Sequence, residues 1–523
     1  MPLYPTRRLI LLFLISSLTL LALFYFSPSS QQLRLYPYPI SRVSPILDYS
    51  QISAKDYLSQ RFKLLAAHQP LDYERSLEAE TARCPLTHLQ SNQDQLKGDG
   101  QGCWKRVSVE ELVEARQKVI DRVKETVHQR GVGELVGNGQ RGLVFTAGNG
   151  DTLNRLLVSL KILRHHGCQL PVEIFGFKNE LESIQTKTIK RDIDSIGNVT
   201  WRPLELVRAE GAWKQFHIKG EAIASSSFSE ILYLDSDNIV VTDPTFLFDS
   251  PVYREHGIVL WPDFNRDAAA NPIWRLLDET CDPLHWQVET GQILIDKRAR
   301  NGLNGIAMEI VKEMNREHEF WFKLSGGDKD TFRYGFYFLD LPFSLAPHYP
   351  SSVGDFLPKH QIYEGHTFCG HTMLQYSLST KDWNQSAFLK FVKNDTTSSK
   401  NGRSMDVAST ENHAPPLFVH ANLLKYSGSW NQRGSTFRTI KKPRQDDVNS
   451  ATLSKIRQTG FPVRGICADV WSVSATEEDS LREDFINSRK GEIETIGFGR
   501  SFSGVLREFE EIYWKFGGRT GGF

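Results

Sequence analysis

The sequence predicts a mixed α/β fold, and three observations carry this prediction. Residues 143–177 read as a strand, a small-residue loop, a Leu-rich helix and a second strand, which is the pattern of a βαβ unit. Residues 231–234 form a short apolar run, as expected of a strand buried inside a sheet. Strand and helix patterns continue to alternate as far as Met314, and such alternation is typical of α/β domains.

The N-terminus predicts a transmembrane signal anchor. Arg7 and Arg8 precede residues 9–26, which contain no charged residue and are just long enough to span a membrane. Basic residues ahead of this run predict a cytoplasmic tail at residues 1–8 and a lumenal remainder. A cleaved signal peptide, and hence a secreted soluble protein, is the alternative. It is disfavoured because the run ends in large side chains at residues 23–26.

The rest of the chain divides into three predicted parts. Residues 27–105 are rich in Ser, Pro, Gln and Tyr and predict a lumenal stem, with some helix between residues 55 and 82. A capping box that begins at Ser108 opens a helix near the start of the main folded domain, which we place at residues 106–440. Residues 441–523 are expected to form a C-terminal extension packed on that domain.

Cysteines and glycosylation sequons agree with a lumenal location. The six cysteines all follow the predicted anchor, and an even number favours disulfides in an oxidising compartment, although fifteen pairings remain open. Asn198, Asn384 and Asn394 each begin an Asn-x-Ser/Thr sequon and are predicted glycosylation sites.

The charge balance argues against a nucleic-acid-binding protein. The 62 Lys and Arg residues equal the 62 Asp and Glu residues, so the formal net charge is zero. Neutralising phosphates along a nucleic acid requires a basic excess or a basic stripe. No nucleic acid is therefore expected as a partner.

The predicted βαβ unit offers a place for a nucleotide. The loop that follows the strand at residues 143–147 is made of small residues, so Thr146 and Ala147 lie where a nucleotide could approach the strand end. Residues 137–142 match a dinucleotide-binding string, but they precede the strand instead of following it. They are therefore predicted to be an ordinary loop.

Two carboxylates end the buried strand at residues 231–234. Asp235 and Asp237 must meet water, a cation or a ligand, because an unpaired carboxylate is costly to bury. Carboxylate oxygens on one turn suit Mg²⁺ or Mn²⁺, and such ions commonly bridge to substrate phosphates. A solvated turn is the alternative.

The chain has, in this order, a strand, a small-residue loop, a Leu-rich helix, Lys219 and the Asp-Ser-Asp turn. This order resembles that of the nucleotide-sugar glycosyltransferases of the GT-A fold, which have a Rossmann-like mixed sheet. The chain more narrowly resembles the fungal Golgi α-mannosyltransferases that build mannan, closest to the α-1,2 branch-initiating subgroup. The resemblance covers roughly residues 105–440 and is carried by residues 230–244, 257–265, 286–297 and 321–336.

The resemblance implies a metal site and a diphosphate contact. Asp235 and Asp237 match the family's metal-binding pair, and His420 follows an apolar strand as a third ligand for Mn²⁺ or Mg²⁺. Lys425 is expected to pair with the diphosphate, although this stretch lacks the Gly and the Pro-Trp of the compared pattern. The alternative for His420 is a core histidine that is hydrogen-bonded to the backbone.

The resemblance also implies contacts to the donor sugar. Lys219, Ser236 and Asp328 are expected to bind the donor, with Asp328 accepting hydrogen bonds from sugar hydroxyls. Gln292 is expected beside the anomeric carbon, and Glu289 is expected to orient the acceptor or act as a base. A solvated helix lysine and plain polar turns are the alternatives for these residues.

The expected protein is a single-pass type II Golgi enzyme with a lumenal catalytic domain. It would move mannose from GDP-mannose to a mannose hydroxyl of glycoprotein or cell-wall mannan, with Mn²⁺ and retention of configuration, as the resemblance implies. A complex with other Golgi mannosyltransferases is a further expectation. The alternatives are a transferase that uses another nucleotide sugar, or a non-catalytic glycan-binding subunit.

Overall fold

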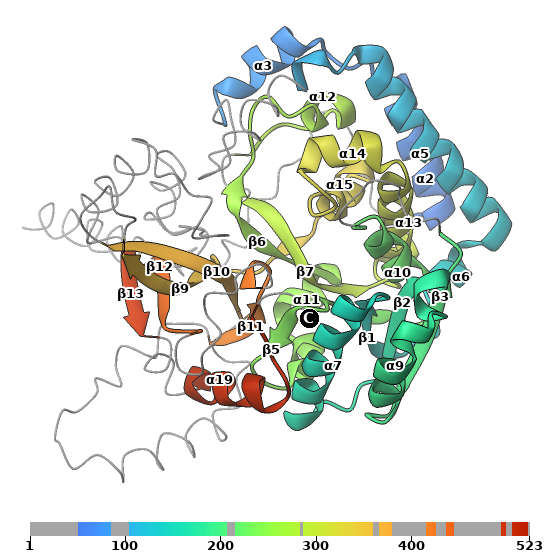
Figure 1. Cartoon of the computed structure of the whole chain (residues 1–523). Coiled ribbons are helices and arrows are strands. Elements are labelled where there is room, and N and C mark those ends of the chain that lie inside the picture. Colours follow the sequence, from blue (N-terminus) through green and yellow to red (C-terminus); the bar gives the residue numbers. More distant parts are fainter. Residues whose placement is uncertain are drawn as a thin grey trace, which may run out of the picture. The chain divides into compact units, whose positions relative to one another are not determined.

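A seven-stranded mixed sheet is the centre of the computed structural model (Figure 1), which describes residues 51–84, 104–206, 215–282, 286–358, 366–378, 415–424, 436–443, 493–497 and 505–520. The strand order is β3-β2-β1-β4-β7-β6-β8. The strands are β1 (Arg141–Thr146), β2 (Val172–Phe177), β3 (Val199–Leu204), β4 (Glu230–Asp235), β6 (Ile258–Arg266), β7 (Trp286–Asp296) and β8 (Ser344–Leu345). β3, β2, β1 and β4 are parallel, whereas β7 is antiparallel to β4. The predicted mixed α/β fold and its βαβ unit are therefore confirmed.

A second sheet is antiparallel throughout and meets the first beside the Asp-Ser-Asp turn. Its six strands have the order β13-β12-β9-β10-β11-β5. They are β5 (Asn238–Val240), β9 (Ser351–Pro358), β10 (His366–Tyr376), β11 (Pro416–His420), β12 (Thr439–Pro443) and β13 (Ile493–Gly497). The chain leaves β4 and enters β5 after two residues, so this turn joins the two sheets. β11 pairs with β5 and places His420 opposite Asn238.

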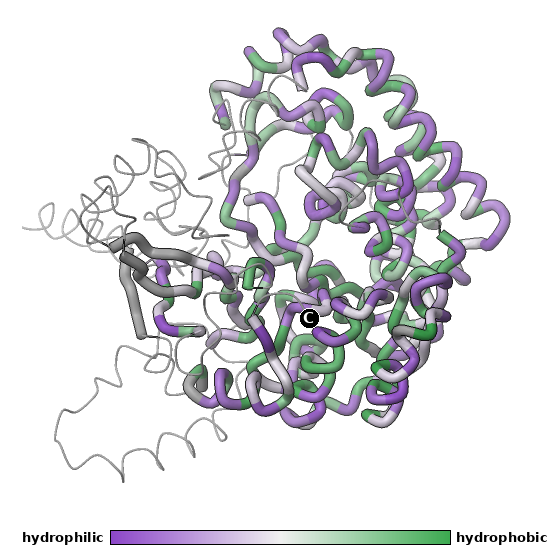
Figure 2. Tube along the Cα trace, in the orientation of Figure 1, coloured by the Kyte–Doolittle hydropathy of each residue, from purple (hydrophilic) through white to green (hydrophobic). Residues whose placement is uncertain are grey.

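Helices cover both faces of the first sheet. They are α2 (Ala54–Ala67), α3 (Tyr73–Thr81), α5 (Val109–Arg130), α6 (Val132–Leu135), α7 (Gly150–His165), α8 (Lys178–Leu181), α9 (Lys187–Asp194), α10 (Ile218–Ser225), α11 (Pro251–His256), α12 (Ile273–Leu277), α13 (Leu303–Arg316), α14 (His318–Ser325), α15 (Thr331–Phe338) and α19 (Val505–Lys515). The capping box predicted at Ser108 is present, and Gly131 ends α5 with φ of 73°. Figure 2 shows hydrophilic and hydrophobic positions alternating along these helices, as expected when only one side is buried.

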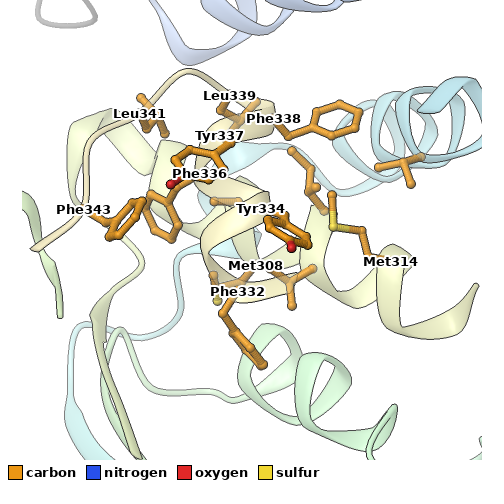
Figure 3. Packing of buried hydrophobic residues seen from close by; sticks show 14 of the residues in the cluster. Met308, Met314, Phe332, Tyr334, Phe336, Tyr337, Phe338, Leu339, Leu341 and Phe343 are labelled. Atoms are coloured by element: carbon orange, nitrogen blue, oxygen red, sulfur yellow. The ribbon is translucent and has the colours of Figure 1, made fainter. Parts of the chain in front are cut away.

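Two apolar clusters hold the helices to the sheet. On one face, Leu153, Leu156, Leu160 and Leu163 of α7 pack with Leu232 and other residues of β1, β2 and β4. On the other face, α5, α10, α13 and α15 pack against alternate residues of the same strands. Figure 3 shows the aromatic residues of α15 gathered beside the methionines of α13. Because strand side chains alternate between faces, burial on both sides fixes the register of β4 and hence the position of its last residue.

The predicted stem requires a correction. Tyr57 and Phe62 of α2 belong to the same buried cluster as α5 and the sheet, and Tyr57 donates a hydrogen bond to the Leu339 carbonyl at 2.7 Å. Cys84 forms a disulfide with Cys281, which lies 197 residues later. Residues 54–84 therefore pack on the main domain, and the boundary predicted near residue 105 lies too late in the chain.

The two ends of the chain are described only in part. The predicted anchor at residues 9–26 lies outside the described residues, among which we find no helix with the length and apolarity needed to cross a membrane. Within the predicted C-terminal extension, Leu506, Phe509 and Tyr513 of α19 are buried in a cluster that includes Val158 of α7. This helix packs on the main domain beside α7 (Figure 1).

Candidate metal and donor site

The candidate site lies where β4 leaves the core. Residues 231–234 are fully buried, and Asp235, the last residue of the strand, is partly exposed. Ser236 and Asp237 follow in the turn, each 7% exposed. The carboxyl ends of parallel strands are the usual place for ligands in α/β sheets, so this turn lies where a ligand site is expected.

Asp235, Asp237 and His420 form the one cluster of potential metal ligands found among the described residues. One ligand atom from each residue lies within 4.8 Å of the others. His420 Nε2 is 3.4 Å from Asp237 Oδ1 and 3.8 Å from Asp235 Oδ2. Two carboxylate oxygens and one imidazole nitrogen are ligands that Mn²⁺ accepts and that leave further positions for substrate oxygens. The three residues predicted as metal ligands are thus brought together by the junction of the two sheets.

The second nitrogen of His420 faces Glu289 on β7. His420 Nδ1 lies 3.2 Å from Glu289 Oε1, which also accepts a hydrogen bond from the Gly291 N–H at 2.6 Å. Burial alone would lower the pKa of His420, but the carboxylates of Glu289 and Asp237 raise it to about 10. Burial likewise opposes ionisation of Glu289, yet His420 and Lys219 lower its pKa to about 2. Both groups are therefore charged in the absence of a cation.

Gly291 makes this approach of His420 possible. A Cβ atom at position 291 would lie 2.6 Å from both Nδ1 and Cε1 of His420, well inside contact distance. Any other residue at this position would displace the imidazole, so glycine is required here for a steric reason.

Lys219 links the metal-binding turn to the predicted sugar-binding residue. Its Nζ lies 3.0 Å from Asp235 Oδ2 and 3.2 Å from Asp328 Oδ2, and it donates to the Thr290 carbonyl at 3.3 Å. Burial opposes the ammonium, but Asp235 and Asp328 raise the pKa of Lys219 well above its usual value. Lys219 and Asp328 are 6% and 4% exposed, which replaces the alternatives of a solvated lysine and a plain turn with a buried ion pair.

The site carries more negative than positive side chains. Asp235, Asp237, Glu289 and Asp328 are four carboxylates, whereas three cations pair with them, namely Lys219, His420 and, at 3.9 Å from Asp237, Arg155. The remaining excess of carboxylates lies in a largely buried space, where uncompensated charge is costly. A divalent cation would remove that excess, so the residues present fit the implied metal.

Gln292, which was predicted to lie beside the anomeric carbon, contacts the metal-binding turn through Asn238. It is fully buried and lies on the same face of β7 as Leu294, which belongs to the α7 side of the core. Its Oε1 accepts a hydrogen bond from Asn238 Nδ2 at 2.5 Å, and the same amide donates to the Gly291 carbonyl at 2.7 Å. Gln292 therefore supports the turn that carries Asp235 and Asp237.

Thr146 reaches the site through a tyrosine that the sequence analysis missed. Thr146 Oγ1 is 2.7 Å from the Tyr233 hydroxyl, which donates to Asp235 Oδ1 at 2.7 Å. Tyr233 and Asp235 are two residues apart on one strand and so share a face, a signal that was available in the sequence. Ala147 directly follows β1 and is buried, and its N–H donates to the Phe175 carbonyl at 2.9 Å.

Two further side chains contact the carboxylates of the site, and the remaining predicted residues lie elsewhere in the chain. Thr290 and Arg155 were not predicted, yet Thr290 Oγ1 donates to Asp328 at 3.3 Å and Arg155 lies 3.9 Å from Asp237 Oδ2. Asn198 is exposed in the turn before β3, as a glycosylated residue must be. Predicted residues that lie outside the described part of the chain are Lys425, Asn384 and Asn394.

Comparison with known proteins identifies relatives that share this region. Residues 140–272 and 275–377 match a family model described as "Mannosyltransferase putative". That match includes Lys219, Asp235, Asp237, Glu289 and Asp328, and it ends before His420. The chain is 33% identical to the α-1,2-mannosyltransferase MNN21 of Candida albicans over 149 residues, or 27% of this chain and 22% of that protein. It is 26% identical to the α-1,2-mannosyltransferase MNN2 of Saccharomyces cerevisiae over 206 residues, or 39% of this chain and 31% of that protein.

These likenesses are partial. The aligned part spans between 22% and 31% of the length of these two relatives. Among solved structures, the bifunctional glycosyltransferase WbbM is similar at 15% identity and a TM-score of 0.28, over 40% of this chain and 39% of that one. A TM-score this low adds no support, so the fold stands on the sheet topology alone.

Proposed function

We propose that the chain belongs to the mannosyltransferase family that includes these fungal proteins, and that it transfers mannose from GDP-mannose to a mannose hydroxyl of mannan. The proposed linkage is α-1,2, the product retains the α configuration, and the catalytic domain has the GT-A fold. The activity written in the names of the relatives supports the proposed reaction.

The observation that carries the proposal is the buried Asp235–Asp237–His420 cluster at the junction of the two sheets. These three side chains would hold Mn²⁺ or Mg²⁺, and the surrounding excess of carboxylates favours a divalent ion. Such a cation, when bound, neutralises the negative charge that develops on a departing nucleoside diphosphate. A glycoside hydrolase would instead need two carboxyl groups on opposite sides of a sugar, and Asp235 and Asp237 lie side by side on one turn.

The neighbouring residues have supporting roles in this proposal. Glu289 keeps His420 turned with Nε2 toward the two aspartates, as outer-shell carboxylates do for histidine ligands. Lys219 bridges the carboxylates of Asp235 and Asp328 and holds them in place. Asp328 then has a carboxylate oxygen with which to accept hydrogen bonds from hydroxyls of the donor sugar.

We further propose that the enzyme is a type II Golgi membrane protein with a lumenal catalytic domain. The apolar run at residues 9–26 supports an anchor. The Cys84–Cys281 disulfide supports an oxidising compartment. Protection of the domain from added protease in intact vesicles, lost when detergent is added, is the expected result. Digestion of the domain in intact vesicles would contradict this placement.

A panel of nucleotide sugars tests the proposed reaction most simply. Full-length protein in detergent is incubated with Mn²⁺, a mannose-terminated acceptor and each donor in turn. Transfer from GDP-mannose alone is the expected result. Turnover of a UDP-sugar without turnover of GDP-mannose would contradict the mannose assignment, and no turnover of any donor would favour a glycan-binding subunit.

A further inference from the structure

Arg155 lies beside the metal-binding turn, and the proposed function gives it no role. It belongs to the second turn of α7, the helix that follows β1 and its small-residue loop. Its Nη1 is 3.9 Å from Asp237 Oδ2, and its Nη2 donates a hydrogen bond to Asp151 Oδ1. His420 Nε2 lies 3.4 Å from the other oxygen of Asp237. The carboxylate of Asp237 is therefore held between an imidazole and a guanidinium.

The pair with Asp151 does not account for this position of Arg155. Asp151 and Arg155 are four residues apart on α7, and the Asp151 side chain is 41% exposed. Exposed pairs of this kind stabilise a helix only slightly. The Arg155 side chain is only 10% exposed, so most of it has been removed from water, which is costly for a cation. Its burial against Asp237 favours a role in the site over a role in helix stability.

A bound divalent cation would change the surroundings of Arg155. A cation held by Asp237 and His420 would share the Asp237 carboxylate with the guanidinium, and like charges at such short range repel each other. An anion in contact with both cations would remove this repulsion. The proposed metal-binding cluster and Arg155 together thus form a place for an anionic ligand.

The charge balance of the site agrees with an anionic ligand. Lys219, Arg155 and a divalent cation carry as much positive charge as the four carboxylates of the site carry negative charge, since a histidine ligand is neutral. Without Arg155, the site would stay negative after the cation has bound, and it would repel an anionic donor. Arg155 is the side chain that makes the cation-bound site neutral.

A phosphate group fits between a metal ion and a guanidinium. Ions such as Mn²⁺ and Mg²⁺ are commonly bound by one or two carboxylates together with substrate phosphates. A guanidinium presents its donors in a planar fork that matches two oxygens of one phosphate group. The exposed pair with Asp151 is weak, so Arg155 can give it up for a phosphate at little cost.

We propose that Arg155 couples cation binding to donor binding by changing its partner. It pairs with Asp237 before the cation binds, and it turns to a phosphate group of the nucleoside diphosphate once the cation is in place. This inference rests on the proposed function, which supplies the nucleoside diphosphate. A cation that binds alone must compete with Arg155 for Asp237, whereas a cation that binds with the donor gives Arg155 a new partner. Cation and donor therefore strengthen each other's binding.

Two variants of Arg155 separate its charge from its geometry. Arg155→Ala removes the guanidinium, whereas Arg155→Lys keeps the positive charge and loses the planar fork. Mn²⁺ binding to full-length protein in detergent is measured by electron paramagnetic resonance without a nucleotide. GDP and UDP are then titrated by calorimetry at saturating Mn²⁺, with no acceptor present. Lys161→Ala, which removes another basic side chain of α7, is the matched control.

The two measurements should change in different directions in Arg155→Ala. We expect it to bind Mn²⁺ alone at least as tightly as the wild type does, because a repelling cation is gone. It should bind the nucleoside diphosphate about 10- to 100-fold more weakly, as expected when a charge-assisted hydrogen-bonded pair is lost. Arg155→Lys should lie between Arg155→Ala and the wild type, and Lys161→Ala should match the wild type. Unchanged nucleotide affinity in Arg155→Ala would overturn the proposal, and so would loss of its Mn²⁺ binding.

The two nucleotides distinguish this inference from the proposed function. If the wild type binds UDP and not GDP, the assignment of the donor is wrong, and weaker UDP binding by Arg155→Ala would still support the role of Arg155. If the wild type and Arg155→Ala bind GDP equally well, the inference fails and the donor assignment stands. A wild type that binds neither nucleotide would overturn both.

Discussion

His420 Nδ1 lies 3.2 Å from Glu289 Oε1. The other ring nitrogen points toward the metal-binding aspartates, so the imidazole is held between two groups of carboxylates. Carboxylates that hold the far nitrogen of a histidine ligand fix its orientation and raise its basicity. This contact gives Glu289 a positioning role in the structure, where the sequence suggested an acceptor-orienting residue or a base.

Replacing Glu289 should weaken metal binding while the fold is kept. We expect Glu289→Ala to reduce Mn²⁺ affinity about 10- to 100-fold, the range typical of such outer-shell residues. Calorimetric titration of Mn²⁺ into the full-length protein measures this change. Glu114→Gln, at an exposed position of α5, is the control and should bind Mn²⁺ like the wild type. Equal Mn²⁺ affinity of Glu289→Ala and wild type would show that Glu289 does not act through His420.

Gly291→Ala should disable the metal site for a steric reason. The added methyl group would lie 2.6 Å from His420 Nδ1, so the imidazole must move. We expect loss of Mn²⁺ binding by electron paramagnetic resonance, with circular dichroism unchanged. Gly133→Ala on α6, where nothing lies within 4 Å of the new atom, is the matched control. Full Mn²⁺ binding by Gly291→Ala would mean that His420 is not a ligand.

Local sequence patterns predicted most of the sheet and the metal-binding turn. An apolar run that ends in two aspartates predicts a buried strand with a polar end, because the apolar residues and the aspartates are adjacent in the sequence. The packing of residues 54–84 was not readable, because it depends on contacts such as the Cys84–Cys281 disulfide between distant segments. Helices were expected there, but nothing local distinguishes a stem helix from one that packs on a domain.

Lys219→Met should destabilise the protein strongly. It leaves the buried carboxylates of Asp235 and Asp328 without their shared cation. Breaking a buried ion pair in this way costs about 3–5 kcal/mol. Urea unfolding in EDTA measures the loss, and Lys118→Met on the exposed side of α5 is the control. Adding Asp328→Asn to Lys219→Met should restore part of the stability, and a further loss in the double variant would contradict this account.

Glu279 should make the folded state less stable as the pH rises. Burial, with Asp340 and Asp278 nearby, raises the pKa of Glu279 to about 8 despite Arg61. Between the ordinary value of 4.5 and about 8, the folded protein binds this proton more tightly than the unfolded chain does. The free energy of unfolding therefore falls with rising pH across that window, by up to about 1.4 kcal/mol per pH unit. Glu279→Gln should flatten this dependence, as measured by urea titrations from pH 5 to about 8, whereas an unchanged slope would show that Glu279 is not the group responsible.

The strand β7 shows why the site was predicted only in part. Glu289 and Gln292 lie in an irregular stretch of the strand, because Trp261 of β6 pairs with Glu289 while the adjacent Leu260 pairs with Ile293. The structure turns Glu289 toward His420 and Gln292 toward Asn238. Which face carries the site depends on how β7 pairs with β4, and that pairing is a long-range property that the sequence alone does not reveal.

The most direct test of the proposed function measures mannose transfer from GDP-mannose by full-length protein after removal of metal. We predict no transfer in EDTA, recovery on adding Mn²⁺, and at least a 100-fold lower rate with Mn²⁺ for His420→Ala, as expected when a metal ligand that stabilises a leaving group is lost. Transfer that persists in EDTA, or that His420→Ala leaves unchanged, would contradict the central claim that Asp235, Asp237 and His420 hold the cation.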